Sequence, residues 1–197
     1  MNREADEQAD LVRRARAGDG RAFESLARAE ERGLYRHALR MLGTPSDAED
    51  VVQDTLLSAW RSIGAFQGTS VRAWLFRIAT NRAIDLLRAR RRHGELPLEP
   101  PDDGDDEPRW SEHPSGDPEL SEMAAGREAT AIVEAALLLI PFEQRTALLL
   151  RDVEGFDYAE IGRITTSEIG TVKSRIHRGR VAVRNALVQR GWKGPGG

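Results

Sequence analysis

The middle of this 197-residue chain is poorly suited to a folded core. Residues 93–126 carry six of the nine prolines, with eleven acidic side chains and one basic one, and almost no apolar residues at regular spacing. Such a segment cannot bury enough apolar surface to offset the entropy lost on ordering. The sequence therefore predicts two small all-α domains, over about 1–92 and 127–192, joined by a flexible acidic linker over 93–126 and followed by a disordered tail over 193–197.

The composition excludes several classes of protein. There is no Cys, which rules out disulfides, thiolate zinc sites and a nucleophilic thiol. The four histidines are scattered, so we expect no metal site and no cofactor. The longest apolar run, residues 135–141, is too short to cross a bilayer, and the polar N-terminus does not resemble a signal peptide. We expect a cytoplasmic protein with no membrane insertion and no small-molecule substrate.

Charge is distributed unevenly along the chain. The net charge of -3 combines +4 in residues 1–92, -10 in the linker and +3 in the remainder. Only Lys173 and Lys193 among the 29 basic residues are lysine. Arginine suits bidentate contacts with phosphate or guanine, although genome composition would produce the same bias.

One helix of the first domain has an unusual outer surface. After Pro45, the spacing of Ser46 and Glu49 predicts a capping box, and a helix then runs to about Gly64. Its expected core residues are Ala48, Val51, Val52, Thr55, Leu56, Ala59 and Ile63. The opposite side carries Leu57 and Trp60 among polar residues. This pattern indicates either a partner-binding surface or packing on a neighbouring helix of the same domain.

A second helix is predicted over 71–92, after a loop at 64–70. One stripe of this helix contains Arg77, Asn81, Ile84, Arg88 and Arg91. A basic stripe with one amide is typical of a nucleic-acid surface, because guanidinium groups bind phosphates and an amide can bind base edges. A solvated helix face would have the same pattern.

The C-terminal domain is predicted to contain a helix-turn-helix. Helices over about 128–139 and 142–154 come first, and Asp157 with Glu160 has the spacing of a second capping box. A break at 165–167 precedes a helix that begins near Glu168. Its expected core residues are Ile169, Val172, Ile176, Val183 and Leu187, and Lys173, Ser174, His177 and Arg178 are expected to point away from the core. Two helices joined by a tight turn in this way fit the major groove of DNA.

Three motifs in this order resemble those of an extracytoplasmic-function sigma factor of bacterial RNA polymerase, in the sigma-70 family. They are DAEDVVQDT at residues 47–55, RAWLFRIATNRAID at 72–85 and GTVKSRIHR at 170–178. The resemblance covers nearly the whole chain. It implies a region 2 domain at about 1–92 and a region 4 domain at about 127–192, and it implies that the protein directs promoter-specific transcription rather than catalysing a reaction.

The resemblance also implies roles for individual residues. The first motif would bind the beta-prime clamp coiled-coil of core polymerase through Asp50, Gln53, Asp54, Leu57, Trp60 and Arg61. The melted minus-ten element would contact Phe66, Gln67, Arg77, Asn81, Arg82, Arg88, Arg91 and Arg92. The minus-thirty-five duplex would contact Thr171, Lys173, Ser174, Arg175, His177, Arg178 and Arg180. Phe142 and the apolar surface of region 4 would meet the flap of the beta subunit, and an anti-sigma protein would hold the two domains together.

The helix-turn-helix departs from the family pattern in its turn. Thr165 and Thr166 stand where a large apolar residue and a glycine are usual, and Glu168 replaces a common proline. Gly162 and Gly179 replace common alanines. A β-branched threonine is costly where the backbone must be left-handed, and a glutamate near DNA phosphates is repelled.

Three other functions compete with this interpretation. A decoy that only titrates an anti-sigma protein should have lost its basic stripe, whereas Arg77, Asn81, Lys173 and Arg178 are present. A helix-turn-helix repressor would explain neither the first motif nor the acidic linker. An enzyme using the carboxylates between Asp47 and Asp54 lacks convergence on one face and an accompanying nucleophile.

Overall fold

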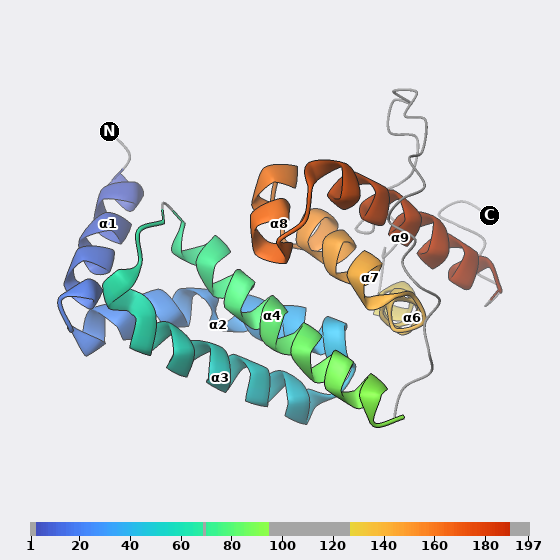
Figure 1. Cartoon of the computed structure of the whole chain (residues 1–197), viewed down its shortest axis with the longest axis horizontal. Helices are drawn as coiled ribbons and strands as arrows, with labels where there is room; N and C mark the ends of the chain where they lie inside the picture. Colours follow the sequence, from blue (N-terminus) through green and yellow to red (C-terminus); the bar gives the residue numbers. More distant parts are fainter. Residues whose placement is uncertain (1–2, 69, 95–126, 190–197) are drawn as a thin grey trace. The chain divides into compact units, whose positions relative to one another are not determined.

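The computed structural model describes residues 3–68, 70–94 and 127–189, and these residues form helices and no strand (Figure 1). The all-α prediction is confirmed. The chain divides into two compact units, residues 1–86 and 87–197, each of which is considered on its own below. Most of the predicted linker and the whole predicted tail lie outside the described residues, so the limits of the domains stay a prediction.

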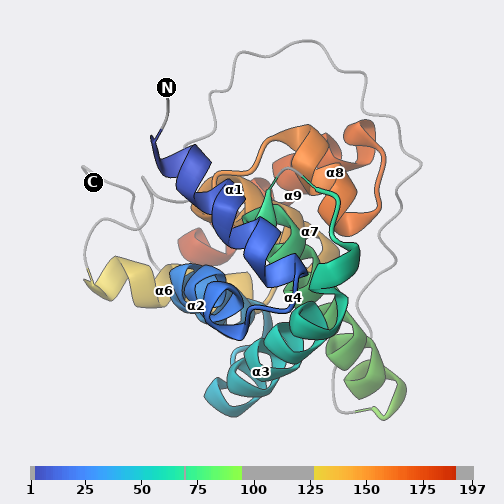
Figure 2. The same ribbon diagram turned by 90° about the vertical axis from the view of Figure 1, so that its left-hand side faces the viewer.

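The first unit is built around a pair of long helices. These are α2 (Gly20–Leu42) and α3 (Pro45–Ser62), which lie side by side in Figure 2. Only Gly43 and Thr44 separate them, and Gly43 has the positive φ of 78° that ends α2, with its N–H donated to the carbonyl of Leu39 at 2.7 Å. Glycine adopts this conformation without strain, which permits the tight reversal.

Two further helices complete the first unit. α1 (Arg3–Arg16) packs on α2 and on the short 3-10 helix η1 (Ile63–Ala65), and α4 (Val71–Arg92) extends to the unit boundary and six residues beyond it. The core of the unit includes Leu34, Met41, Leu75 and Phe76, each no more than 1% exposed.

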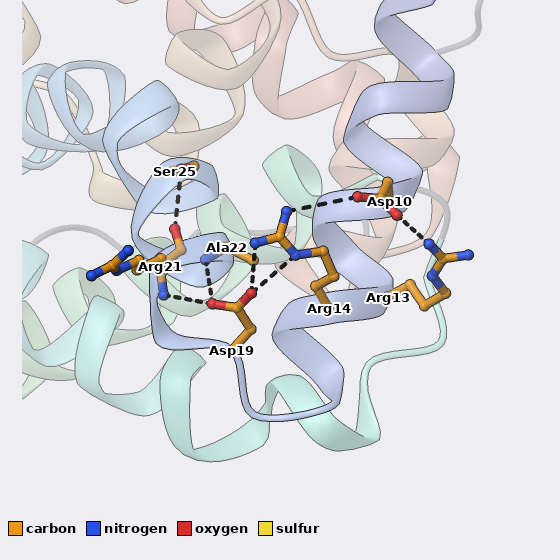
Figure 3. A network of polar contacts seen from close by, with 7 residues as sticks. All are labelled: Asp10, Arg13, Arg14, Asp19, Arg21, Ala22 and Ser25. Carbon is orange, nitrogen blue, oxygen red and sulfur yellow. Dashed lines mark hydrogen bonds and ion pairs between the residues drawn. The ribbon is translucent and has the colours of Figure 1, made fainter.

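A network of polar contacts joins α1 to the start of α2 (Figure 3). Asp19 caps α2 by accepting hydrogen bonds from the backbone N–H groups of Arg21 (3.0 Å) and Ala22 (3.1 Å). Its other carboxylate oxygen accepts from Nε (2.9 Å) and Nη2 (2.7 Å) of Arg14. These contacts lower the pKa of Asp19, with the Arg14 hydrogen bond as the largest cause. Asp19 therefore fixes both the start of α2 and the angle at which α1 meets it.

The predicted capping box at the start of α3 is wrong. The helix begins two residues earlier than the box requires, at Pro45, and Thr44 at the cap position makes no side-chain hydrogen bond to the helix. Proline suits the first helical position because its missing N–H would have had no partner there. Ser46 and Glu49 are exposed residues of the first turns of α3.

The second unit consists of short helices packed around a long one. α6 (Arg127–Leu137), α7 (Phe142–Leu148) and α8 (Tyr158–Thr165) all contact α9 (Ile169–Gln189), and a π-helical turn η2 (Leu149–Val153) continues α7. A Cβ at Gly179 would lie 3.2 Å from the carbonyl oxygen of Gln144 and 3.4 Å from Cβ of Leu148. The absence of a side chain at Gly179 therefore lets α7 and α9 approach closely.

The turn between α8 and α9 contains a strained residue. The capping box at Asp157 and Glu160 is confirmed, and the residue that follows α8 as its C-cap, Thr166, is left-handed with φ 54° and ψ 49°. The Ser167 N–H then donates to the carbonyl of Gly162 at 2.9 Å. A Cβ at Gly162 would lie 2.9 Å from the carbonyl oxygen of Ser167, so this turn requires a glycine there. The sequence analysis expected a conformational cost here, and Thr166 carries it, because left-handed backbone is unfavourable for β-branched residues.

No helix among the described residues is long and apolar enough to span a membrane.

Candidate functional site

The outer face of α3 has the exposure that the sequence predicts. The buried face holds Ala48, Val51, Val52, Thr55 and Ala59. All six residues of the predicted polymerase-binding set are exposed, namely Asp50, Gln53, Asp54, Leu57, Trp60 and Arg61. Leu57 is 47% exposed and Trp60 is 40% exposed. The helix thus fills its part of the core and still presents two large apolar side chains to solvent.

Trp60 also packs in part on a neighbouring helix of the same domain, which was the alternative interpretation of its pattern. Its ring contacts Phe23 of α2, with ring centroids 5.2 Å apart and planes tilted by 56°. Part of the indole is therefore covered by the unit itself, and the exposed part is accessible to a partner. A large aromatic side chain that is already oriented loses little rotamer entropy when a partner covers it.

A groove between α2 and α3 borders this exposed face and was missed by the sequence analysis. It has a volume of about 690 Å³. Tyr35, Val52 and Leu56 supply its apolar lining, and Gln53 belongs both to the groove and to the predicted binding set. Charged side chains of both signs line the rest of it, namely Glu31, Arg32, Arg36 and Glu49. The sequence pattern of α3 alone could not reveal the groove, because α2 provides half of its lining.

The predicted minus-ten residues on α4 are mostly exposed. Arg77, Asn81 and Arg82 lie in the first unit, and Arg88, Arg91 and Arg92 lie on α4 beyond Leu86. All are exposed except Arg91, which is half-buried. The first turn of α4 is fixed by Ser70, whose Oγ accepts a hydrogen bond from the Ala73 N–H at 3.1 Å.

The two predicted loop residues differ from each other. Gln67 is exposed, whereas Phe66 is buried and its ring packs against Trp74 with centroids 4.9 Å apart. Phe66 is therefore packed within the unit, and little of its ring is accessible to a base. Gln67 is accessible as it stands.

A buried histidine lies behind the exposed face of α4. His37 of α2 shares a hydrogen bond at 3.0 Å between its Nε2 and Oγ1 of Thr80, the residue before Asn81. Its ring meets Phe76 edge-on at a centroid distance of 5.4 Å. Burial, followed by repulsion from Arg40 and Arg72, lowers the pKa of His37 to about 3. The ring is therefore neutral at physiological pH and joins α2 to α4 at Thr80, the residue before Asn81.

The predicted DNA-reading residues of α9 fall into three groups. Lys173 and His177 are exposed, and Nζ of Lys173 lies 5.6 Å from the ring centroid of Tyr158 in α8. Thr171, Arg175 and Arg178 are half-buried. Ser174 is buried, so the expectation that it points away from the core is wrong. Its hydroxyl donates to the carbonyl of Thr171 at 3.0 Å and accepts from Nη2 of Arg178 at 3.2 Å.

Arg175 and Arg180 of α9, like Arg178, have partners inside the unit. Arg180 makes a bidentate ion pair with Asp152 of η2, with nitrogen–oxygen distances of 2.9 and 2.6 Å, and the Asp152 side chain is fully buried. Arg175 donates from Nη1 to Oγ of Ser167 at 2.9 Å, and so supports the strained turn. Phosphate contacts predicted for these residues would compete with these internal bonds.

Ile169 was assigned to the core and is instead 49% exposed. The remainder of the predicted core stripe is buried, namely Val172, Ile176, Val183 and Leu187. Phe142, assigned to an apolar surface, is buried at 1% exposure. A helical pattern gives the direction of a side chain but not how far the packed neighbours extend along the helix, which is why the assignment of Ile169 to the core failed. The contact of Phe142 with the beta flap was expected from the family resemblance alone and stays a prediction.

Within the described residues, no group of three or more histidine and acidic side chains is placed to hold a metal ion.

Family models match both halves of the chain. Residues 26–93 match Sigma-70 region 2, and residues 130–183 match Sigma-70, region 4. Together the two matches cover more than half of the sequence.

Curated relatives and a solved structure agree with these matches. The chain is 36% identical to the RNA polymerase sigma-H factor of Pseudomonas aeruginosa, over 95% of this chain and 96% of that protein. It is also 36% identical to the ECF RNA polymerase sigma factor SigE of Mycolicibacterium smegmatis, over 85% of this chain, and spans 62% of that relative's length. The sigma factor RpoE of Bartonella quintana, solved in complex with the anti-sigma factor NepR, superposes with a TM-score of 0.64 at 27% identity, over 84% of this chain and 96% of that one.

Proposed function

Because the chain belongs to the extracytoplasmic-function sigma factors of the sigma-70 family, we propose that it directs promoter-specific transcription initiation by dividing the work between two units. The first unit binds core RNA polymerase and opens the minus-ten element. The second unit reads the minus-thirty-five element as duplex DNA. The observation that carries the proposal is the exposure of Leu57 and Trp60 on a helix that buries Ala48, Val51, Val52, Thr55 and Ala59 on its other side.

The exposed face of α3 is the docking surface for the coiled-coil of the beta-prime clamp. Two large apolar side chains held in water are costly unless a partner covers them. They are surrounded by Asp50, Asp54 and Arg61, which can supply the polar rim that surrounds such anchors in protein interfaces. The groove lined by Tyr35 and Leu56 lies at the edge of this surface and extends the area that a helical partner can fill.

The exposed stripe of α4 holds the melted minus-ten element. Asn81 presents an amide that can both donate to and accept from a base edge, and Arg77, one turn earlier, presents a guanidinium to the backbone. Gln67 in the preceding loop is exposed and can reach a flipped base. The buried pair of His37 and Thr80 anchors this part of α4 from behind, so the stripe is held in place before DNA binds.

The helix-turn-helix of α8 and α9 reads the minus-thirty-five element. Its exposed Lys173 and His177 supply donors for acceptor atoms of bases in the major groove. Arg178 is half-buried and anchored on Ser174, which orients its guanidinium without enclosing it. Membership of the sigma factor family also implies that the second unit contacts the flap of the beta subunit of polymerase.

An anti-sigma protein is the expected regulator. The Bartonella quintana relative was solved with such a partner, and an exposed apolar face is the feature that such a partner must cover. We place its binding on the same α3 face, so that polymerase and regulator compete for Leu57 and Trp60.

Reconstitution with core RNA polymerase tests the function directly. The complex is incubated with a fragmented genomic template, and the 5′ ends of its transcripts are sequenced. We expect starts that share two sequence elements, both absent with core polymerase alone. A decoy sigma would compete for an anti-sigma protein and yield no new starts, and a repressor would bind DNA without polymerase. Either result would overturn the proposal.

A further inference from the structure

The first residue of the recognition helix is apolar and unpacked. Ile169 begins α9 and is 49% exposed, and its neighbours Glu168 and Gly170 are exposed as well. Apart from its two chain neighbours and the backbone of its own helix, no heavy atom lies within 4 Å of the position that a Cβ would occupy at Gly170. The first residues of α9 are thus exposed, and about half of Ile169 is accessible to a partner.

Ile169 shares one side of α9 with the two exposed polar readers. It precedes Lys173 by four residues and His177 by eight, and residues four apart are neighbours on a helix surface. Each step of four residues advances about 6 Å along the axis. The three side chains therefore form a short row that begins with a branched apolar group and continues with an ammonium and an imidazole.

The core of the unit does not need Ile169. Val172 and Ile176 fill the corresponding positions one and two turns further on, and both are buried. A protein-binding patch would require further exposed apolar side chains around Ile169, but its row continues with Lys173 and His177 instead. In the major groove, by contrast, the C5-methyl group of thymine is the apolar feature of the base edges, and the N-terminal residues of a recognition helix are those that reach base edges.

We propose that Ile169 contacts the C5-methyl group of a thymine in the upstream promoter element and so adds a sequence preference to the polar contacts of Lys173 and His177. This inference rests on the proposed function of α9. Because a 6 Å advance matches about two base-pair steps of 3.4 Å, the thymine lies within about two base pairs of the base nearest Lys173. Ile169 is then a specificity-determining residue.

Replacing thymine by uracil tests the contact, since uracil lacks only the methyl group. An upstream element is first selected from a randomised duplex by the full chain bound to core polymerase. Each thymine of that element is then changed in turn to uracil, and competition binding is measured. We expect one replacement to weaken binding by wild type about fourfold, the effect of losing one buried methyl group. The I169A complex should bind both templates equally, at the weaker level.

Val188→Ala is the matched control, because Val188 is 60% exposed at the other end of α9. The V188A complex should keep the wild-type sensitivity to uracil. The inference is overturned if I169A keeps that sensitivity, or if I169A weakens binding to core polymerase without DNA, which would assign Ile169 to a protein partner. Lys173→Ala distinguishes failure of the Ile169 contact from failure of the proposed DNA-reading function of α9. If K173A alters the selected preference but no uracil effect depends on Ile169, only this inference fails. If wild type selects no upstream element, the role of α9 fails as well.

Discussion

The exposed faces of α3 and α9 carry the two sets of residues that the sequence predicted most specifically, and the two sets fare differently. On α3 all six side chains are exposed. On α9, Lys173 and His177 are exposed, Ser174 is buried and Arg180 is paired with Asp152. α3 packs mainly on α2, whereas α9 is contacted by α6, α7 and α8. A helical wheel therefore predicts exposure well for a helix packed on one side, and it misplaces individual residues such as Ser174 on a helix that several others contact.

The largest expected effect concerns the ion pair of Arg180 and Asp152. Arg180→Ala leaves a buried carboxylate without its partner, so the free energy of unfolding should fall by about 3 kcal/mol. Arg61→Ala on the exposed face of α3 should leave stability nearly unchanged and weaken polymerase binding instead. Urea denaturation of both variants measures the contrast. Equal stability of R180A and wild type would contradict a stabilising role for this ion pair.

The second prediction concerns the anchors on α3. Trp60→Ala should weaken binding to core polymerase by about 2 kcal/mol, as for a central aromatic anchor, while leaving the helical content intact. Asp54→Arg should act in the same direction through charge. Fluorescence titration with labelled core polymerase measures both, and Glu24→Ala on the exposed side of α2 is the control. Unchanged affinity in both test variants would remove the docking role from this face.

The third prediction follows from the lowered pKa of His37. In the unfolded chain the imidazole has its ordinary pKa of 6.5, whereas in the folded protein the value is about 3. Between these values the unfolded state binds a proton that the folded state does not, so stability falls as the pH falls, by up to about 1.4 kcal/mol per pH unit.

Urea denaturation between pH 4 and 7 measures this slope. His37→Gln should remove its contribution, and Gln189→Ala, at an exposed position of α9 without a titratable group, should not. A slope that is the same in H37Q and wild type would show that other groups cause the acid sensitivity.

The smallest expected effect is a gain of stability in the turn before α9. Thr166→Gly relieves the left-handed conformation of a β-branched residue and should raise the free energy of unfolding by about 1 kcal/mol. Thr165→Gly should destabilise, because Thr165 ends α8 and donates from its hydroxyl to the carbonyl of Ile161 at 2.8 Å. Thermal unfolding of the two variants compares them. Destabilisation by T166G would imply that Thr166 makes a contact that outweighs its strain.

Local chemistry in the sequence predicted the elements well, and tertiary packing decided the rest. The capping box of Asp157 and Glu160 and the left-handed turn at Thr166 depend on residues close in sequence, and both were recognised. The ion pair of Arg180 joins residues 28 positions apart, and the bond of His37 to Thr80 joins residues 43 positions apart. The periodic spacing of residues within one helix cannot predict contacts between residues so far apart in the sequence. The predicted capping box at Ser46 was wrong for a local reason instead, because Pro45 allows the helix to begin earlier.

The division of labour between the two units is tested most directly by transcription on two templates, one fully duplex and one already melted over the minus-ten element. Transcript yield is measured for wild type, Asn81→Ala and Lys173→Ala in complex with core polymerase. We expect N81A to fail on the duplex and recover on the melted template, because strand opening is then supplied. K173A should remain impaired on both, because its upstream contacts involve duplex DNA in either case. Recovery of both variants alike, or of neither, would contradict the assignment of opening to the first unit and upstream reading to the second.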